Sequence, residues 1–163
     1  MKPILKGILA LGFLVTASIS AWAGVSVTFA KPETYNDMPW SASDKERTLK
    51  TLTEHFTKLG AQLPSDQHLK IIVTHIGLAG RIEPAAFRST QEIRIMRGRA
   101  DWPSMQLQYS LESKGQVLQS GEDKLADMTY LDHHNSYPTN ETFRYEKQMI
   151  DSWFQKKFIT VSR

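Results

Sequence analysis

The chain has 163 residues, with 20 Lys and Arg against 17 Asp and Glu, and it contains no cysteine. The lack of cysteine excludes disulfide bonds, thiol catalysis and the lipid-modified cysteine of a bacterial lipoprotein. The composition is that of an ordinary globular protein, so a hydrophobic core has to supply the stability.

The N-terminal residues have the three-part layout of a secretory signal peptide. Two lysines form a positive start, an apolar run follows, and residues 21–23 read Ala-Trp-Ala, a small-x-small cleavage signal. We therefore predict a signal peptide over residues 1–23, cleaved after Ala23, and a single periplasmic domain over residues 24–163. The apolar run is too short for a stable membrane anchor, which needs about 20 apolar residues.

Cleavage would also change the charge of the protein. Two lysines leave with residues 1–23, so the rest of the chain has 18 Lys and Arg against 17 Asp and Glu, a net charge of +1. A role that depends on general attraction to polyanions is therefore not indicated, and we predict no nucleic-acid partner.

The first half of the predicted domain reads as strand, loop, helix and strand. Apolar residues alternate with polar ones over residues 25–29. The Ser-Asp-Lys-Glu sequence at 43–46 is typical of a capping box, and apolar residues at helical spacing continue to a stop at Gly60. Residues 69–76 are apolar on both faces, which predicts a central strand.

The second half ends in a hairpin and a helix. Residues 77–91 are expected to be irregular, and a short strand is predicted over 93–95. Residues 105–111 alternate cleanly and predict a strand with one buried face, which 116–125 joins as a hairpin partner. A broad apolar stripe predicts a closing helix over 143–158.

This order of elements predicts an α+β fold. We expect a two-layer sandwich with a mixed, mostly antiparallel sheet of about five strands and two helices on one face. The first helix is expected to cross over, so that the first two strands are parallel. The other face of the sheet would carry Arg94, Gln106, Gln108 and Ser110.

Five motifs support a family resemblance. They are Val-Ser-Val-Thr-Phe-x-x-Pro-Glu at 25–33, Gly-Leu-Ala-Gly-Arg-Ile-Glu-Pro at 77–84, Glu-Ile-Arg-Ile at 92–95, Asp-Trp-Pro at 101–103 and Arg-Tyr-Glu-Lys-Gln-Met-Ile-Asp-x-Trp-Phe at 144–154. With the signal peptide, this ordered set resembles an exported proteobacterial family, domain of unknown function 3016. The resemblance implies a Gram-negative periplasmic protein, and it implies no reaction, ligand or catalytic residue.

The glycines of residues 77–84 predict a place where a ligand approaches the backbone. Arg81 could bind a carboxylate or phosphate there, although a sharp turn with Arg81 paired to a carboxylate explains the same residues. The predicted ligand-binding residues on this loop and the polar sheet face are Arg81, Glu83, Arg94, Gln106 and Gln108, and the expected ligand is a small anion.

Charge is unevenly distributed along the chain. Residues 81–99 hold five arginines against two glutamates, and residues 122–132 hold four acids against one lysine. The asymmetry either steers an anionic partner to one patch or reflects two segments that neutralise each other.

Asp132, His133 and His134 suggest a metal site, because imidazoles and a carboxylate suit Zn²⁺ or Cu²⁺. Adjacent histidines point apart in an extended chain, so a further ligand such as His68 or His75 would be needed. A solvated loop is the alternative, and we predict no cofactor.

Signatures of familiar enzymes are missing from the sequence, which has no Gly-x-Ser-x-Gly, Ser-x-x-Lys, His-Glu-x-x-His or P-loop pattern. The leading prediction is a soluble periplasmic domain that binds an envelope protein or a small anionic ligand without catalysis. The alternative is a small hydrolase or metal-dependent enzyme with a non-standard site. The oligomeric state stays open.

Overall fold

The computed structural model describes residues 24–85, 92–98 and 100–160. The predicted signal peptide, residues 1–23, lies outside these described residues. Within them, no helix combines the length and the apolar character that crossing a membrane requires.

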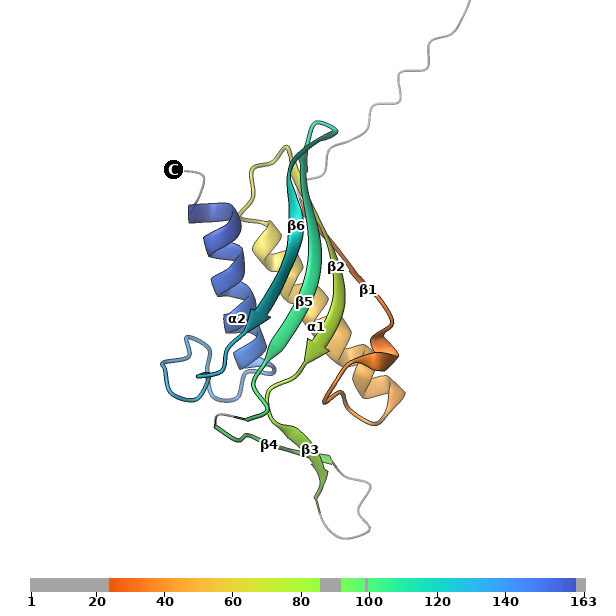
Figure 1. Cartoon of the computed structure of the whole chain (residues 1–163), viewed down its shortest axis with the longest axis vertical. Helices are drawn as coiled ribbons and strands as arrows, with labels where there is room; N and C mark the ends of the chain where they lie inside the picture. Colours follow the sequence, from red (N-terminus) through yellow and green to blue (C-terminus); the bar gives the residue numbers. More distant parts are fainter. Residues whose placement is uncertain (1–23, 86–91, 99, 161–163) are drawn as a thin grey trace, which may run out of the picture.

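One layer of the fold is a four-stranded mixed sheet with the strand order β1-β2-β5-β6 (Figure 1). The strands are β1 (Gly24–Phe29), β2 (Gln67–Gly77), β5 (Ser104–Ser113) and β6 (Gln116–Ala126). β1 runs parallel to β2, and the other two pairs are antiparallel. The predicted crossover and the predicted hairpin are therefore both confirmed.

The second layer consists of the two helices α1 (Ala42–Gly60) and α2 (Arg144–Phe154). A short 3-10 helix, η1 (Pro32–Thr34), precedes α1, and a π-helical turn, η2 (Gln155–Ile159), ends the predicted closing helix. The N-cap residue of α1 is Ser41, two residues before the predicted capping box, because the hydroxyl of Ser41 accepts a hydrogen bond from the amide of Asp44 at 3.1 Å.

The core lies between the sheet and both helices. Alternate residues of β2 and β5 point into it, and Leu52 and Phe56 of α1 and Ile150 and Phe154 of α2 meet them there. Trp153 contacts the rings of four other core aromatics edge-on: Phe56, Tyr109, Phe154 and Phe158. The opposite face of the sheet is open and largely polar, which confirms the α+β fold with both helices on one side.

A separate two-stranded sheet holds the residues between β2 and β5. β3 (Arg81–Pro84) pairs antiparallel with β4 (Glu92–Ile95). The main sheet therefore has four strands rather than about five, and residues 81–84, expected to be irregular, form a strand. Alternation in residues 93–95 indicates a strand but does not identify its neighbour, and here the neighbour is β3. This β3–β4 hairpin lies beyond the end of β2 (Figure 1).

Candidate functional site

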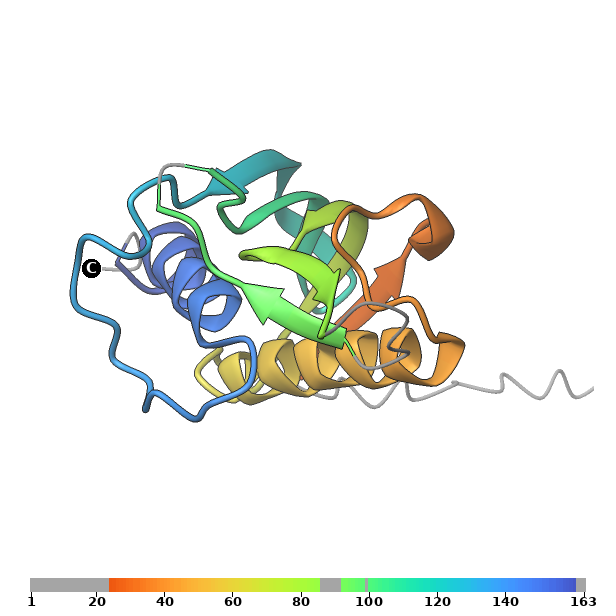
Figure 2. The ribbon, with the colours of Figure 1, turned by 90° about the horizontal axis from the view of Figure 1, so that it is seen from below.

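A pocket of about 590 Å³ lies between the β3–β4 hairpin and the start of α2. Its wall is completed by Pro39 and, just before α2, by Thr139, Glu141, Thr142 and Phe143. Seen from below, the hairpin lies beside the first turn of α2 (Figure 2). We call this hollow the hairpin pocket. Its position at the end of the sheet, outside the core, leaves it open to a ligand.

One wall of the hairpin pocket is apolar. Ile82 of β3, Ile93 of β4 and Met96 line it. The side chains of Ile93 and Met96 are 42% and 40% exposed. Large apolar side chains that remain exposed at a concave surface are a common feature of binding sites for ligands with an apolar part.

Arg94 on β4 holds the hairpin against the rest of the protein. Its guanidinium Nη1 donates to the carbonyl oxygen of Ala79 at 2.8 Å, and Nη2 donates to the carbonyl oxygen of Asp37 at 2.9 Å. Arg94 therefore has a structural role, and its side chain also lines the pocket.

Glu146, in the first turn of α2, lies at the same pocket and is 2% exposed. Its Oε1 accepts a hydrogen bond from the amide of Ala79 at 2.7 Å. Burial raises the pKa of the Glu146 carboxyl, and the hydrogen bond from Ala79 and the charges of Arg94 and Lys147 oppose that rise only in part. Burial thus weakens the negative charge at this side of the pocket.

A second arginine of the pocket, Arg144, is held by an aromatic ring. Its guanidinium carbon lies 4.6 Å from the ring centroid of Tyr145, and its Nη2 donates to the Tyr145 hydroxyl at 2.9 Å. The Tyr145 ring in turn packs edge-on against the buried Tyr130, with ring centroids 4.8 Å apart. Tyr145 therefore holds the guanidinium of Arg144 in place at the pocket wall.

The start of α2 adds to the positive character of the pocket. The residue before the helix, Phe143, has φ 57° and ψ 35° and provides no side-chain cap. Amides in the first turn of a helix favour negative charge. The nearby carboxylate of Glu141 forms an ion pair with Lys147. Arg94, Arg144 and the helix start together therefore favour an anion in the pocket.

Only Arg94 among the predicted ligand-binding residues lines the hairpin pocket. Arg81 forms an exposed ion pair with Glu83, with Nη2 and Oε1 2.5 Å apart, which is the pairing that the sequence left as an alternative. Gln106 and Gln108 lie on the open face of β5, where Gln108 donates to Glu122 at 2.6 Å. The structure thus separates Arg94, on the hairpin, from the two glutamines, on the main sheet.

The two charged segments do not pair with each other among the ion pairs of the described residues. Arg81 and Arg97 both contact Glu83 in and beside the hairpin. Asp123 of β6 pairs with Lys157, with Nζ and Oδ2 2.9 Å apart. These ion pairs do not join the arginine-rich segment to the acidic one.

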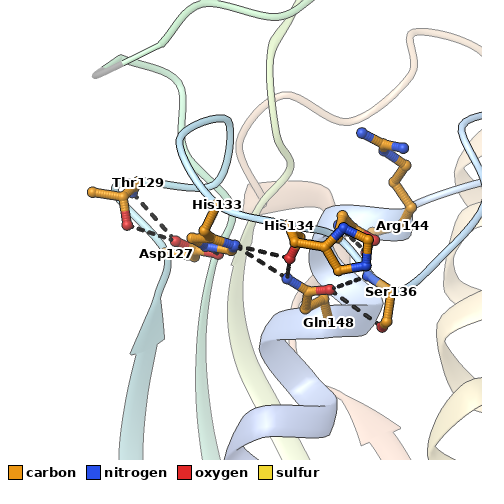
Figure 3. A network of polar contacts seen from close by, with 8 residues as sticks. Asp127, Thr129, His133, His134, Ser136, Arg144 and Gln148 are labelled. Carbon is orange, nitrogen blue, oxygen red and sulfur yellow. Dashed lines mark hydrogen bonds and ion pairs between the residues drawn. The ribbon is translucent and has the colours of Figure 1, made fainter.

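The predicted metal ligands are not gathered into a cluster. His133 Nε2 lies 2.8 Å from Asp127 Oδ2, and Gln148 of α2 donates to the carbonyl oxygen of His134 at 3.0 Å (Figure 3). Asp132 takes no part in these contacts. Across the described ranges there is no group of three His, Asp or Glu side chains placed to hold a metal ion. The contacts instead attach the loop after β6 to α2.

Glu146 and Arg144 were not among the site residues predicted from the sequence. Glu146 comes three and four residues before Met149 and Ile150, so helical spacing places it on the buried face of α2. A carboxylate in the apolar stripe of a helix is the signal that could have found it. No local pattern indicates that the hairpin would lie against this turn.

The comparisons with known proteins identify a family without a described activity. No curated protein and no solved structure shows significant similarity to the chain. A family model described as protein of unknown function, DUF3016, matches residues 23–156, which include every part of the hairpin pocket. Because this match covers most of the sequence, the chain belongs to the DUF3016 family.

Proposed function

We propose that this protein is exported to the periplasm of a Gram-negative bacterium and binds a small amphipathic organic anion in the hairpin pocket, without catalysis. The observation that carries the proposal is the juxtaposition, in one pocket, of Arg94 and Arg144 with the apolar wall of Ile82, Ile93 and Met96. A ligand with a carboxylate or phosphate head and a short apolar tail matches both surfaces.

The location follows from the sequence of residues 1–23, whose layout is that of a cleaved signal peptide. Expression of the full chain in a Gram-negative host, followed by osmotic-shock release, tests it. We expect the released protein to begin at Gly24. Retention in the membrane pellet, or an intact Met1 in the cytoplasmic fraction, would contradict export.

Binding without catalysis is supported by the state of the acidic groups at the pocket. The Glu141 carboxylate is paired with Lys147, and Glu146 is held by the Ala79 amide. These contacts tie both carboxylates to the fold, which suits a fixed binding surface.

Octanoate and octanol are suitable probes, because they share an apolar tail and differ in charge. We expect octanoate to raise the melting temperature in proportion to its concentration, and octanol to bind at least about tenfold more weakly, a difference of about 1.4 kcal/mol. Calorimetric titration gives both affinities.

Two variants locate the site. Arg144→Gln removes a cation and Ile93→Asp disrupts the apolar wall, and each should weaken octanoate binding by about tenfold or more. Arg47→Gln, on the exposed surface of α1, is the matched control and should leave the affinity unchanged. If neither octanoate nor octanol binds, or if both pocket variants bind octanoate like the control, the proposal is wrong.

A further inference from the structure

A second surface, separate from the hairpin pocket, lies along the edge of the main sheet. β6 is the terminal strand in the order β1-β2-β5-β6, and among the described residues it pairs with β5 alone. Its pairing is irregular only near the hairpin turn, between Leu111 and Glu112, so residues 119–126 form a regular edge. Long regular edges are usually covered in native proteins, because their free backbone groups can pair with another strand.

Helix α2 lies beside this edge on the helical side of the sheet (Figure 1). Two hollows, of about 390 and 490 Å³, lie between β6 and α2. They share four lining residues, Lys124, Leu125, Trp153 and Lys156, and therefore adjoin each other. We call the two adjoining hollows together the β6 groove.

The β6 groove is basic. Its two acidic residues have partners: Asp123 is bound by Lys157 and by the indole N–H of Trp153, and Asp127 is bound by His133. Lys124 and Lys156 form no ion pair with any residue in the described ranges. The groove thus presents the ammonium group of Lys156 above an apolar floor, and Lys124 lies at its rim, on the open face of the sheet.

We propose that an extended acidic peptide segment of a partner protein adds to β6 as a fifth strand and lies over this groove. An added strand would extend the sheet by about 4.8 Å and use the free backbone groups of the edge. Successive side chains of a strand point to opposite faces. One set would face Lys156 and Trp153 on the α2 side, and the other would lie near Lys124, which is opposite Gln106 on the open face.

The charge of the groove also decides between a partner protein and a second copy of this chain. Antiparallel pairing of two β6 edges centred near residue 124 would bring the Lys124 side chains, and the Lys156 side chains, of both copies close together. Like-charge juxtaposition opposes association, whereas an acidic strand provides the missing counter-charges. The partner is therefore an acidic segment rather than a second copy.

The test uses the protein produced from the full chain and two fluorescein-labelled octapeptides. One repeats Glu-Glu-Val-Val, which puts acidic side chains on both faces of a strand, and the other has Lys in place of Glu. Fluorescence anisotropy measures affinity, and amide hydrogen exchange followed by NMR shows which backbone groups the peptide protects. We expect the acidic peptide to bind at least tenfold more tightly than the basic one and to slow exchange at amides of residues 119–126.

Charge reversal separates this groove from other basic surfaces. The double variant Lys124→Glu/Lys156→Glu should lose at least tenfold in affinity for the acidic peptide. The matched control, Lys50→Glu/Lys58→Glu on α1, carries the same change in net charge and should bind like the native protein. Arg144→Gln should also bind the peptide normally, so failure of the pocket proposal and failure of this one are distinguishable.

Each other outcome overturns the proposal. Absence of acidic-peptide binding excludes the docking site, and binding that leaves the amides of residues 119–126 unprotected excludes strand addition. Equal losses in the two double variants would mean general charge attraction only. If light scattering finds a dimer whose β6 amides are already protected, the edge belongs to a second copy.

Discussion

Arg94 and Asp37 are joined by a hydrogen bond of 2.9 Å from the guanidinium Nη2 to the backbone carbonyl oxygen. The bond links β4 to the loop before α1, 57 residues earlier in the chain. The same guanidinium bonds the carbonyl oxygen of Ala79, just after β2. One side chain therefore fixes the hairpin, the loop and the end of the main sheet relative to one another, and with them the shape of the hairpin pocket.

Arg94→Ala is expected to loosen the hairpin. The substitution leaves the carbonyl groups of Ala79 and Asp37 without their charged donor, and we expect a loss of about 2–4 kcal/mol in the free energy of unfolding. Urea denaturation measures the loss, and amide exchange in β3 and β4 should accelerate. Arg47→Ala, which removes an exposed ion pair on α1, is expected to cost less than about 1 kcal/mol. Equal losses in the two variants would refute the clamping role of Arg94.

Gly80 and Gly115 form a matched pair for backbone strain. Both have positive φ, 74° and 80°, so alanine at either position is strained by about 1–2 kcal/mol. A Cβ at Gly80 would lie 2.6 Å from the carbonyl oxygen of Ile95, whereas a Cβ at Gly115 has no atom within 4 Å. Gly80→Ala should therefore be the more destabilising in thermal unfolding, by roughly 1–3 kcal/mol. A smaller loss for Gly80→Ala than for Gly115→Ala would show that β4 does not pack closely on Gly80.

Glu146→Gln tests the effect of burial on a carboxyl group. Burial raises the pKa of Glu146 above its value in the unfolded chain, so stability linked to this group is present at low pH and is lost as pH rises through the folded-state pKa. Glutamine has no charge and can still accept the hydrogen bond from Ala79. The variant should therefore gain stability relative to the native protein between about pH 4 and about pH 8. Urea denaturation across this range checks the trend, and a constant difference would contradict it.

His133 is expected to make the stability of the fold depend on pH, with a contribution from its carboxylate partner. The carbonyl oxygen of His134 is the main cause that raises the pKa of the His133 imidazole; burial opposes the rise, and Asp127 adds to it. A raised histidine pKa stabilises the fold below the unfolded value of about 6.5, and this stability is lost as pH rises through the folded-state pKa. His133→Gln should thus be more destabilising at about pH 5 than at about pH 9.

Asp127→Asn provides the check on this interpretation, because it removes the charge of the partner and leaves the imidazole in place. Thermal unfolding of this variant should show a weaker pH dependence over the same range than the native protein. An unchanged pH dependence would mean that the Asp127–His133 contact does not determine the titration.

Much of the fold was predictable from local patterns. Alternation in residues 105–111 indicated a strand with one buried face, and Met105, Leu107 and Tyr109 are buried there as expected. Helical spacing in residues 143–158 indicated an apolar stripe that meets the sheet. Such patterns are readable because the periodicities of strands and helices are local geometry, and burial selects for them directly.

The candidate site was much less predictable. Arg94 was expected beside Gln106 and Gln108, because a strand over residues 93–95 seemed to belong to the main sheet. The pairing of β4 with β3 moved Arg94 to the hairpin, next to Glu146 and Arg144. Neither the alternation of residues in β4 nor the charge of Arg94 indicates that β4 pairs with β3.

The sequence by itself determined both helices, the strands of the main sheet, their order, the parallel crossover and the buried faces, because these depend on the spacing of residues within one segment or between adjacent ones. The tertiary structure alone decided that the β3–β4 hairpin leaves the main sheet, that Glu146 is buried at a pocket, and that Lys124 and Lys156 border one groove. These relationships join residues far apart in the chain. They arise from long-range packing, in which each contact depends on how all the elements fit together rather than on the residues that flank it.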